Sequence, residues 1–232
     1  TPPPTPFIGA SDRDDEAIAI LGVPYDKTAS FRKGTRLAPN AIREVSDAAI
    51  ETYSPRLKKD LENLAFSDLG DLSIAPESEP EAVVDLLHEA TVELLGKGTT
   101  PVIVGGAHSI SPGAIRAAFA KYPDRSGTGE EFQEMERGNR LITPAEISQR
   151  LPNAPLWITF DIDVFDPAEC PGTGTPEAGG LTYRECEIIL DDLRNCNIVG
   201  LDLVEVSPPL DPSGISTALA AKLLRELLLI LP

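Results

Sequence analysis

The stretch LWITFDIDVFDPAECPGTGTPEAGG, residues 156–180, decides the fold, because it contains a strand and two neighbouring acids. Its first five residues are aliphatic, aromatic or β-branched and predict a buried strand. The Pro- and Gly-rich chain that follows cannot continue a strand, so we expect the strand to end near Val164. Since side chains alternate along a strand, Asp161 and Asp163 are predicted to point to one side, about 6–7 Å apart.

Two carboxylates at the end of an apolar strand repel each other and are poorly solvated. A cation, a basic side chain or a proton on one of them must compensate. Residues 165–180 contain no Lys or Arg, which favours a metal ion. An isolated pair of this kind is more commonly a helix cap or a solvent-facing pair. The metal hypothesis therefore depends on what the rest of the chain contributes.

Strands and helices alternate along the chain. Hydrophobic periodicity predicts further strands at residues 17–23, 64–69, 100–104 and 198–206, and helices at 39–50, 79–96, 112–122, 183–193 and 215–230, the last capped by Ser213. This alternation predicts an α/β fold with a mostly parallel sheet covered by helices on both faces. The loop at 25–36 is equally well a ligand-binding loop or a plain connector.

The alternation breaks down after residue 123. Residues 123–140 are polar and contain no strand-like run, although the chain is expected to return to the sheet there. A short extended piece at residues 141–142 and a helix beginning near Thr143 are expected next. One strand region is therefore missing from the pattern after residue 124.

Length and composition predict one domain over residues 1–232, with residues 1–16 forming an extended Pro-rich arm. The 41% hydrophobic and 25% charged content is typical of a globular protein. A net charge of −17 argues against nucleic acid and anionic membranes as partners and is compatible with a small cationic ligand. No apolar run is long enough to span a bilayer and no signal peptide is evident, so a cytoplasmic location is expected.

Three cysteines at irregular spacing predict neither a disulfide framework nor a zinc site, and they favour a reducing compartment.

Other candidate site residues follow strands. Ligands gather at the carboxyl ends of parallel strands. His108 follows the strand at 100–104, and Glu205 lies near the end of the strand at 198–206. Each alone is explained by a local hydrogen bond or a surface ion pair. Their position on the same rim as Asp161 and Asp163 favours a metal site.

Several collinear motifs then resemble the ureohydrolase family, the arginase and agmatinase group, and the pattern is closest to agmatinase. They are GVPYD (22–26), RKGTR (32–36), PNAIR (39–43), DLGD (68–71), GGAHS (105–109), FDIDVFDP (160–167), PGTGTP (171–176) and DLVEVSP (202–208). The resemblance implies a three-layer α/β/α sandwich with a mostly parallel central sheet. It also implies a homo-oligomer, a trimer or hexamer.

The resemblance implies manganese-dependent hydrolysis of a guanidino compound, agmatine first, to urea and an amine, a reaction of polyamine metabolism. His108, Asp161 and Asp163 would be catalytic residues and Mn²⁺ ligands, and Glu205 would hold the cationic substrate group. A guanidinium is a poor electrophile, so water must react as hydroxide, which two bridged divalent ions about 3.5–4 Å apart supply at neutral pH. Carboxylate oxygens with imidazole suit Mn²⁺.

Two departures from the family pattern stand out. Ala107 replaces the aspartate of the family's GGDHS motif, which weakens the surroundings of His108. The family's D-A-H-x-D motif, which supplies three of six metal ligands, is absent, and the chain has only two histidines, His88 and His108. The chain passes from residue 124 to 125 where that block is expected, and the remaining ligands suffice for at most one ion.

Three interpretations are compatible with these residues. The favoured one is a ureohydrolase whose active-site segment lies outside the given sequence. The second is a catalytically inactive homologue that acts as a metabolite-binding or oligomer-partner protein. The third is a hydrolase with one metal ion held by His108, Asp161 and Asp163 alone.

Overall fold

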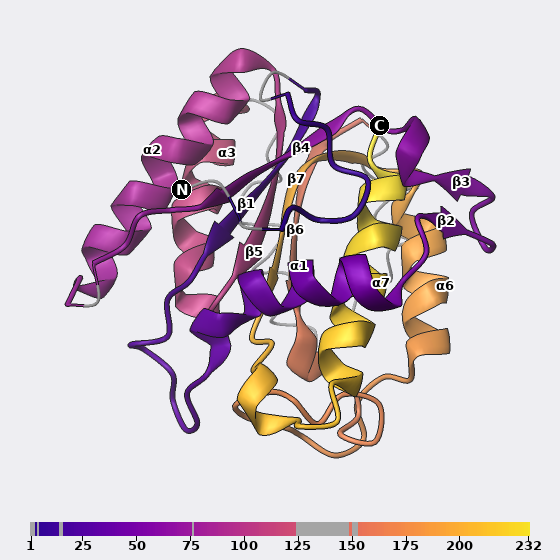
Figure 1. The fold of residues 1–232 in the computed structure, drawn as a ribbon. Helices are drawn as coiled ribbons and strands as arrows, with labels where there is room; N and C mark the ends of the chain where they lie inside the picture. The colour runs from indigo at the N-terminus through magenta and orange to yellow at the C-terminus, as the bar shows by residue number, and fades with distance from the viewer. Residues whose placement is uncertain (1–2, 4, 14–15, 76, 124–148, 150–152) are drawn as a thin grey trace.

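A computed structural model describes all residues except 1–2, 4, 14–15, 76, 124–148 and 150–152 (Figure 1). Its centre is a five-stranded parallel sheet in the order β4-β1-β5-β7-β6. The strands are β1 (Ile18–Val23), β4 (Phe66–Asp71), β5 (Thr100–Gly105), β6 (Pro155–Asp161) and β7 (Asn197–Val204). A small antiparallel pair, β2 (Tyr53–Ser54) and β3 (Lys59–Asp60), lies outside this sheet.

Helices cover both faces of the sheet. In Figure 1, α2 (Pro80–Lys97) and α3 (Ser111–Lys121) lie on one face, and α1 (Ala38–Ala49), α6 (Tyr183–Leu193) and α7 (Ile215–Ile230) lie on the other. α2 packs on α3, and α7 packs on both α1 and α6. The predicted three-layer α/β/α architecture with a parallel sheet is confirmed.

The strands are buried on both faces, as parallel strands between helices require. All six residues of β1 are buried. Ile18 and Ile20 belong to the core cluster that includes α7, whereas Ala19 and Leu21 belong to the cluster that includes residues of α2 and α3. Burying each large aliphatic side chain contributes about 1.5–3 kcal/mol. This two-sided core holds the carboxyl ends of the strands in fixed positions.

The strand that contains Asp161 is shorter than predicted. β6 ends at Asp161, and Ile162–Val164 form a 3-10 helix, η4, with Asp161 as its N-cap. Asp161 Oδ1 accepts a hydrogen bond from the Asp163 backbone N–H at 3.0 Å. A short aspartate side chain that bonds the backbone two residues on turns the chain out of the strand. The prediction that both aspartates alternate along one strand ending near Val164 was therefore wrong.

The prediction of an extended arm over residues 1–16 is wrong at Phe7 and Ser11. Phe7 is 1% exposed, its backbone N–H donates to Asp68 Oδ2 at 2.9 Å, and Ser11 N–H donates to Phe66 O at 2.9 Å. Around Phe7 and Ser11 the segment therefore packs on the sheet, because an aromatic side chain gains more from burial than from exposure. The single-domain assignment of residues 1–232 stays a prediction.

Two smaller expectations also need correction or placement. The N-cap of α7 is Gly214 (φ 76°) rather than Ser213, although Ser213 Oγ accepts from Ile215 N–H at 3.3 Å. The expected extended piece at 141–142, the helix from Thr143 and the gap in the pattern after residue 124 lie outside the described residues.

In the described part of the chain, no helix combines the length and apolarity needed to cross a membrane. Cys170, Cys186 and Cys196 are all free thiols.

Candidate functional site

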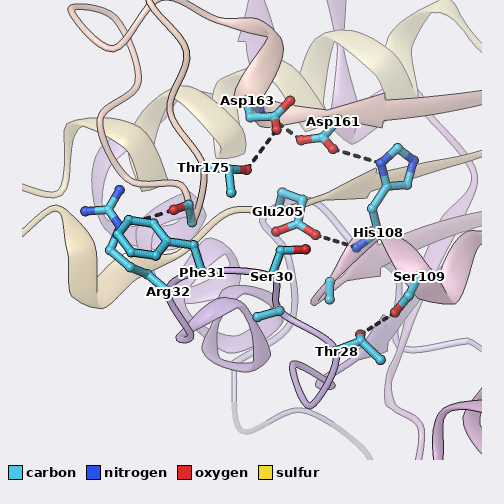
Figure 2. Close-up of a pocket in the computed structure, with 13 residues that line it drawn as sticks. Thr28, Ser30, Phe31, Arg32, His108, Ser109, Asp161, Asp163, Thr175 and Glu205 are labelled. Carbon is cyan, nitrogen blue, oxygen red and sulfur yellow. Dashed lines mark hydrogen bonds and ion pairs between the residues drawn. The ribbon is translucent and has the colours of Figure 1, made fainter.

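A cavity of about 200 Å³ lies at the carboxyl ends of β5, β6 and β7 (Figure 2). It brings together all four residues selected from the sequence, which come from three different strand ends: His108, Asp161, Asp163 and Glu205. The loop that follows β1 and the PGTGTP segment form the rest of its wall: Thr28, Ala29, Ser30, Phe31, Arg32, Gly174 and Thr175, with Ala107 and Ser109 beside His108.

The glycines after β5 bring His108 to the cavity. A Cβ on Gly106 would lie 1.9 Å from the backbone oxygen of Tyr25, so only glycine permits this close passage of two loops. His108 follows directly and begins the short 3-10 helix η3 (His108–Ile110). Its ring is contacted at both nitrogens: Nδ1 lies 2.8 Å from Asp161 Oδ2, and Nε2 lies 2.9 Å from Thr159 Oγ1.

Glu205 reaches the cavity through an unusual backbone conformation. Its φ is +67°, the left-handed region, which costs a residue with a side chain about 1–2 kcal/mol. Its N–H donates to Gly106 O at 3.0 Å, and its Oε1 accepts the His108 backbone N–H at 2.6 Å. Figure 2 shows the carboxylate between His108 and Thr175. Such strain persists where the surroundings impose it, and it is concentrated at functional sites.

Burial and the neighbouring charge of Asp161 disfavour the ionised forms of two acids in the cavity, Asp163 and Glu205. Burial and the neighbouring charge of Asp161 raise the pKa of Asp163 to about 6. Burial also raises the pKa of Glu205, and the hydrogen bond from the His108 amide opposes that rise. The hydrogen bond to Asp161 raises the pKa of His108, whereas burial lowers it. The imidazole of His108, which follows β5 in η3, therefore supplies part of the compensation that the sequence predicted for the aspartate pair.

The loop at 25–36 is a wall of the cavity rather than a plain connector. Arg32 crosses to the PGTGTP segment, where its Nε donates to Gly174 O at 3.1 Å and its Nη2 donates to Thr173 O at 2.9 Å. Thr175, the next residue of that segment, donates its hydroxyl to Asp163 Oδ2 at 3.3 Å. Arg32 thus fixes the backbone that presents Thr175 to the aspartate pair.

A second carboxylate network lies beneath the site, and sequence reasoning missed it. Asp202 of β7 is 0% exposed. It accepts hydrogen bonds from Trp157 Nε1 at 2.8 Å, Thr159 Oγ1 at 2.7 Å and Ser111 Oγ at 2.9 Å. Burial raises the pKa of Asp202, and these three donors oppose the rise. The signal was present, because an acid inside the apolar run IVGLDLV requires partners.

Two of the quoted motifs serve the fold rather than the cavity. Arg43 of α1 is 2% exposed, its Nε lies 2.8 Å from Asp68 Oδ2, and its Nη1 lies 2.6 Å from Asp71 Oδ1. The PNAIR and DLGD motifs therefore join α1 to β4. Breaking such a buried pair from one side costs about 3–5 kcal/mol.

The donors of the cavity fit one metal ion better than two. His108, Asp161 and Asp163 offer an imidazole and carboxylate oxygens, the donor types that suit a hard divalent ion such as Mn²⁺. Two of these donors, His108 Nδ1 and Asp161 Oδ2, already face each other. Over the described residues, no three His, Cys, Asp or Glu side chains converge as a ready metal site. A pair of bridged ions needs more protein ligands than these three residues supply, so a binuclear centre does not fit them.

Comparison with known proteins identifies the family. The model described as "Arginase family" matches residues 16–129 and 126–230. The agmatinase of Bacillus subtilis is 34% identical over 277 residues, with 96% of this chain and 95% of that protein covered. The guanidinobutyrase of Pseudomonas aeruginosa is 30% identical, with 92% and 86% covered. The crystal structure of a Clostridium difficile protein assigned as an agmatinase superposes with a TM-score of 0.83 at 32% identity, covering 93% of this chain and 96% of the other.

The same comparisons locate the departure from the family. The alignment with the Bacillus subtilis protein runs over 277 residues and this chain has 232, so at least 45 aligned positions (277 less 232) have no counterpart here. The family model matches in two pieces that meet at residues 126–129. This is the region in which the D-A-H-x-D motif is missing from the sequence. The match nevertheless spans both flanks of that region, and the chain belongs to the arginase family of hydrolases.

Proposed function

We propose that this chain hydrolyses a guanidino compound, agmatine in the first place, to urea and an amine in a manganese-dependent reaction. The observation that carries the proposal is the convergence of three carboxylates, Asp161, Asp163 and Glu205, on one cavity of about 200 Å³. Such a cavity attracts a small cation, and the net charge of −17 adds a long-range attraction.

Glu205 is the group that we assign to the guanidinium of the substrate. A carboxylate and a guanidinium pair through parallel hydrogen bonds in one plane. The Oε1 of Glu205 is held by the His108 amide, and its backbone is fixed in the left-handed region. The carboxylate is therefore oriented before the substrate arrives, which lowers the entropy cost of binding.

His108, Asp161 and Asp163 are the residues that would hold a divalent ion. Such an ion, when bound, lowers the pKa of a water molecule so that hydroxide is available at neutral pH. In the overall reaction the water oxygen bonds to the guanidino carbon, the bond from that carbon to the substituted nitrogen breaks, and the amine leaves with a proton from water. The chain's own contribution is to hold the guanidinium group against these acids, with Glu205 as its partner.

Agmatine is preferred over a guanidino acid because of the charges in the wall. The only arginine among the described lining residues, Arg32, donates to two carbonyl oxygens, and the three acids disfavour a substrate carboxylate. The related proteins named agmatinase and guanidinobutyrase represent these two substrate classes. An inactive homologue, the second interpretation of the sequence, finds no support in these relatives, which are enzymes.

Urea release tests the proposal. The purified protein with saturating Mn²⁺ is expected to release urea from agmatine faster than from 4-guanidinobutyrate, and Glu205→Gln is expected to abolish most of that release. No urea from either compound with Mn²⁺ bound would overturn the proposal. We further propose that the protein is cytoplasmic and forms a homo-oligomer, a trimer or hexamer. Light scattering on the purified protein measures the oligomeric state directly.

A further inference from the structure

Phe31 is the one large apolar side chain among the described residues that line the cavity. The other described lining residues are charged, carry hydroxyl groups or are small. Phe31 is 74% exposed, the largest value for a large hydrophobic residue in the described part of the chain. Single exposed apolar residues are common on protein surfaces, so it is the position of this ring at the cavity that matters.

The loop that carries Phe31 is held on both sides of the ring. Before it, Thr28 Oγ1 lies 2.5 Å from the Oγ of Ser109 in η3. After it, the Lys33 carbonyl oxygen accepts a hydrogen bond from Ser207 Oγ at 3.3 Å. These contacts tie the loop to the segments that follow β5 and β7. The backbone at Phe31 is therefore placed before a ligand arrives, which lowers the entropy cost of a contact with the ring.

Arg32 holds the Phe31 ring from one side. The guanidinium carbon lies 5.4 Å from the ring centroid, within the range of a cation–π contact. The same guanidinium donates to the carbonyl oxygens of Thr173 and Gly174, so it is fixed in turn. The rest of the ring surface is open. A second cation on the ring would be repelled by Arg32, whereas an apolar group would not, so the open surface suits an apolar chain.

The chain that follows Phe31 lies close to the carboxylate of Glu205. A Cβ on Gly174 would lie 2.9 Å from Arg32 O and 4.0 Å from Glu205 Oε2, so both flank the same glycine. Figure 2 shows Glu205 between His108 and Phe31. A small cation paired with Glu205 therefore has His108 on one side and the aromatic ring on the other.

We infer that Phe31 is a specificity-determining residue that packs against the alkyl chain of a guanidino substrate. The guanidinium pairs with Glu205, and the methylene groups beyond it lie against the open surface of the ring, where their burial strengthens binding. The ring thereby selects a guanidinium on an unbranched alkyl chain, as in agmatine, over guanidine or methylguanidine. The inference rests on the function proposed above, because it takes Glu205 as the partner of the guanidinium.

Two ligands that differ only in chain length separate this contact from other effects of the ring. Methylguanidine and butylguanidine are titrated into the purified full chain by isothermal calorimetry, without added metal, so that neither compound is turned over. Wild type is expected to bind butylguanidine about 10-fold more tightly, because its further methylene groups are partly buried. In Phe31→Ala this ratio is expected to fall to about 2-fold or less, with the affinity for methylguanidine unchanged.

Three further variants define the contact. Phe31→Leu keeps an apolar surface and is expected to retain most of the ratio. Ile188→Ala is the matched control, because Ile188 is 64% exposed on α6 and is not among the described lining residues, and it is expected to leave the ratio unchanged. Glu205→Gln is expected to weaken both compounds equally, which would place both in the cavity.

The inference is wrong if wild type binds neither compound, if its ratio is close to one, or if Phe31→Ala keeps the wild-type ratio. Equal losses of affinity for both compounds in Phe31→Ala would make the role of the ring purely structural. A changed oligomeric state of that variant in light scattering would place the ring between copies of the chain and would equally overturn the inference. Chain-length selectivity that depends on Phe31, without urea release in the presence of Mn²⁺, overturns only the function proposed above.

Discussion

Glu205 Oε1 accepts the backbone N–H of His108 at 2.6 Å, although the two residues are 97 positions apart in the chain. This contact joins the end of β7 to the loop after β5, because the two strands are neighbours in the sheet. The carboxylate assigned to the substrate and the imidazole assigned to the cation are thus positioned by one hydrogen bond.

Glu205→Gln tests the substrate role. The amide keeps the shape and can still accept from His108 N–H, but it loses the charge that pairs with a guanidinium. Truncating one member of a buried charged pair costs about 2–5 kcal/mol, so kcat/KM for agmatine is expected to fall roughly 30-fold or more. The exposed Glu62→Gln serves as the matched control, and an unchanged kcat/KM in Glu205→Gln would remove this residue from the site.

Metal content tests the incomplete ligand set. A protein with the intact mass of this sequence, 24.8 kDa, is expected to bind one Mn²⁺ per chain when measured by plasma mass spectrometry after gel filtration. Chelation is expected to abolish urea release, and added Mn²⁺ to restore it. Two ions per chain at this mass would contradict the conclusion that the three donors do not fit a binuclear centre.

The raised pKa of Asp163 predicts that the stability of the metal-free protein depends on pH. Its pKa is raised from 3.8 to about 6 in the folded state, so the folded state holds the proton more tightly than the unfolded state. The stabilisation by that proton is complete below pH 3.8 and is lost as the pH rises to about 6. Above this window, Asp163→Asn is expected to unfold at a higher temperature than wild type, and each 1 kcal/mol gained raises Tm by about 2–4 °C.

The matching measurement compares thermal unfolding of the two proteins at pH 3.5 and pH 8 without metal. The difference in Tm is expected only at pH 8, and Mn²⁺ is expected to stabilise wild type more than the variant. A variant that is less stable than wild type at pH 8 without metal would show that the Asp161 and Asp163 charges do not repel in the folded protein.

Arg32→Met tests the connection between the two loops. It removes the hydrogen bonds to Thr173 O and Gly174 O while keeping most of the apolar stem. Hydrogen bonds from a charged group are worth about 1.5–3 kcal/mol, so Thr175 is expected to lose its fixed position and KM for agmatine to rise about 10-fold or more. Arg36→Met, in the same loop with a side chain that is 62% exposed, is the control. Equal kinetics in the two variants would limit Arg32 to a surface role.

The local sequence determined the helices and strands and pointed to four residues of the cavity, His108, Asp161, Asp163 and Glu205. The apolar runs at 17–23, 100–104 and 198–206 predict strands because a strand between two helical layers must be apolar on both faces. The helices follow from their 3.6-residue period. Since parallel strands end at the same edge, the positions of His108, Asp161, Asp163 and Glu205 after three strands were enough to predict that they converge.

Only the tertiary structure decided how those residues are held. Asp161 leaves the strand to cap a 3-10 helix, and Glu205 takes a left-handed conformation. Neither follows from periodicity, because each depends on a hydrogen bond made in the folded chain. Arg32 meets residues more than 140 positions away, and Asp202 collects donors from β6 and from Ser111, where α3 begins. Hydrogen-bond partners are set by distance in space, which the order of residues along a chain does not specify.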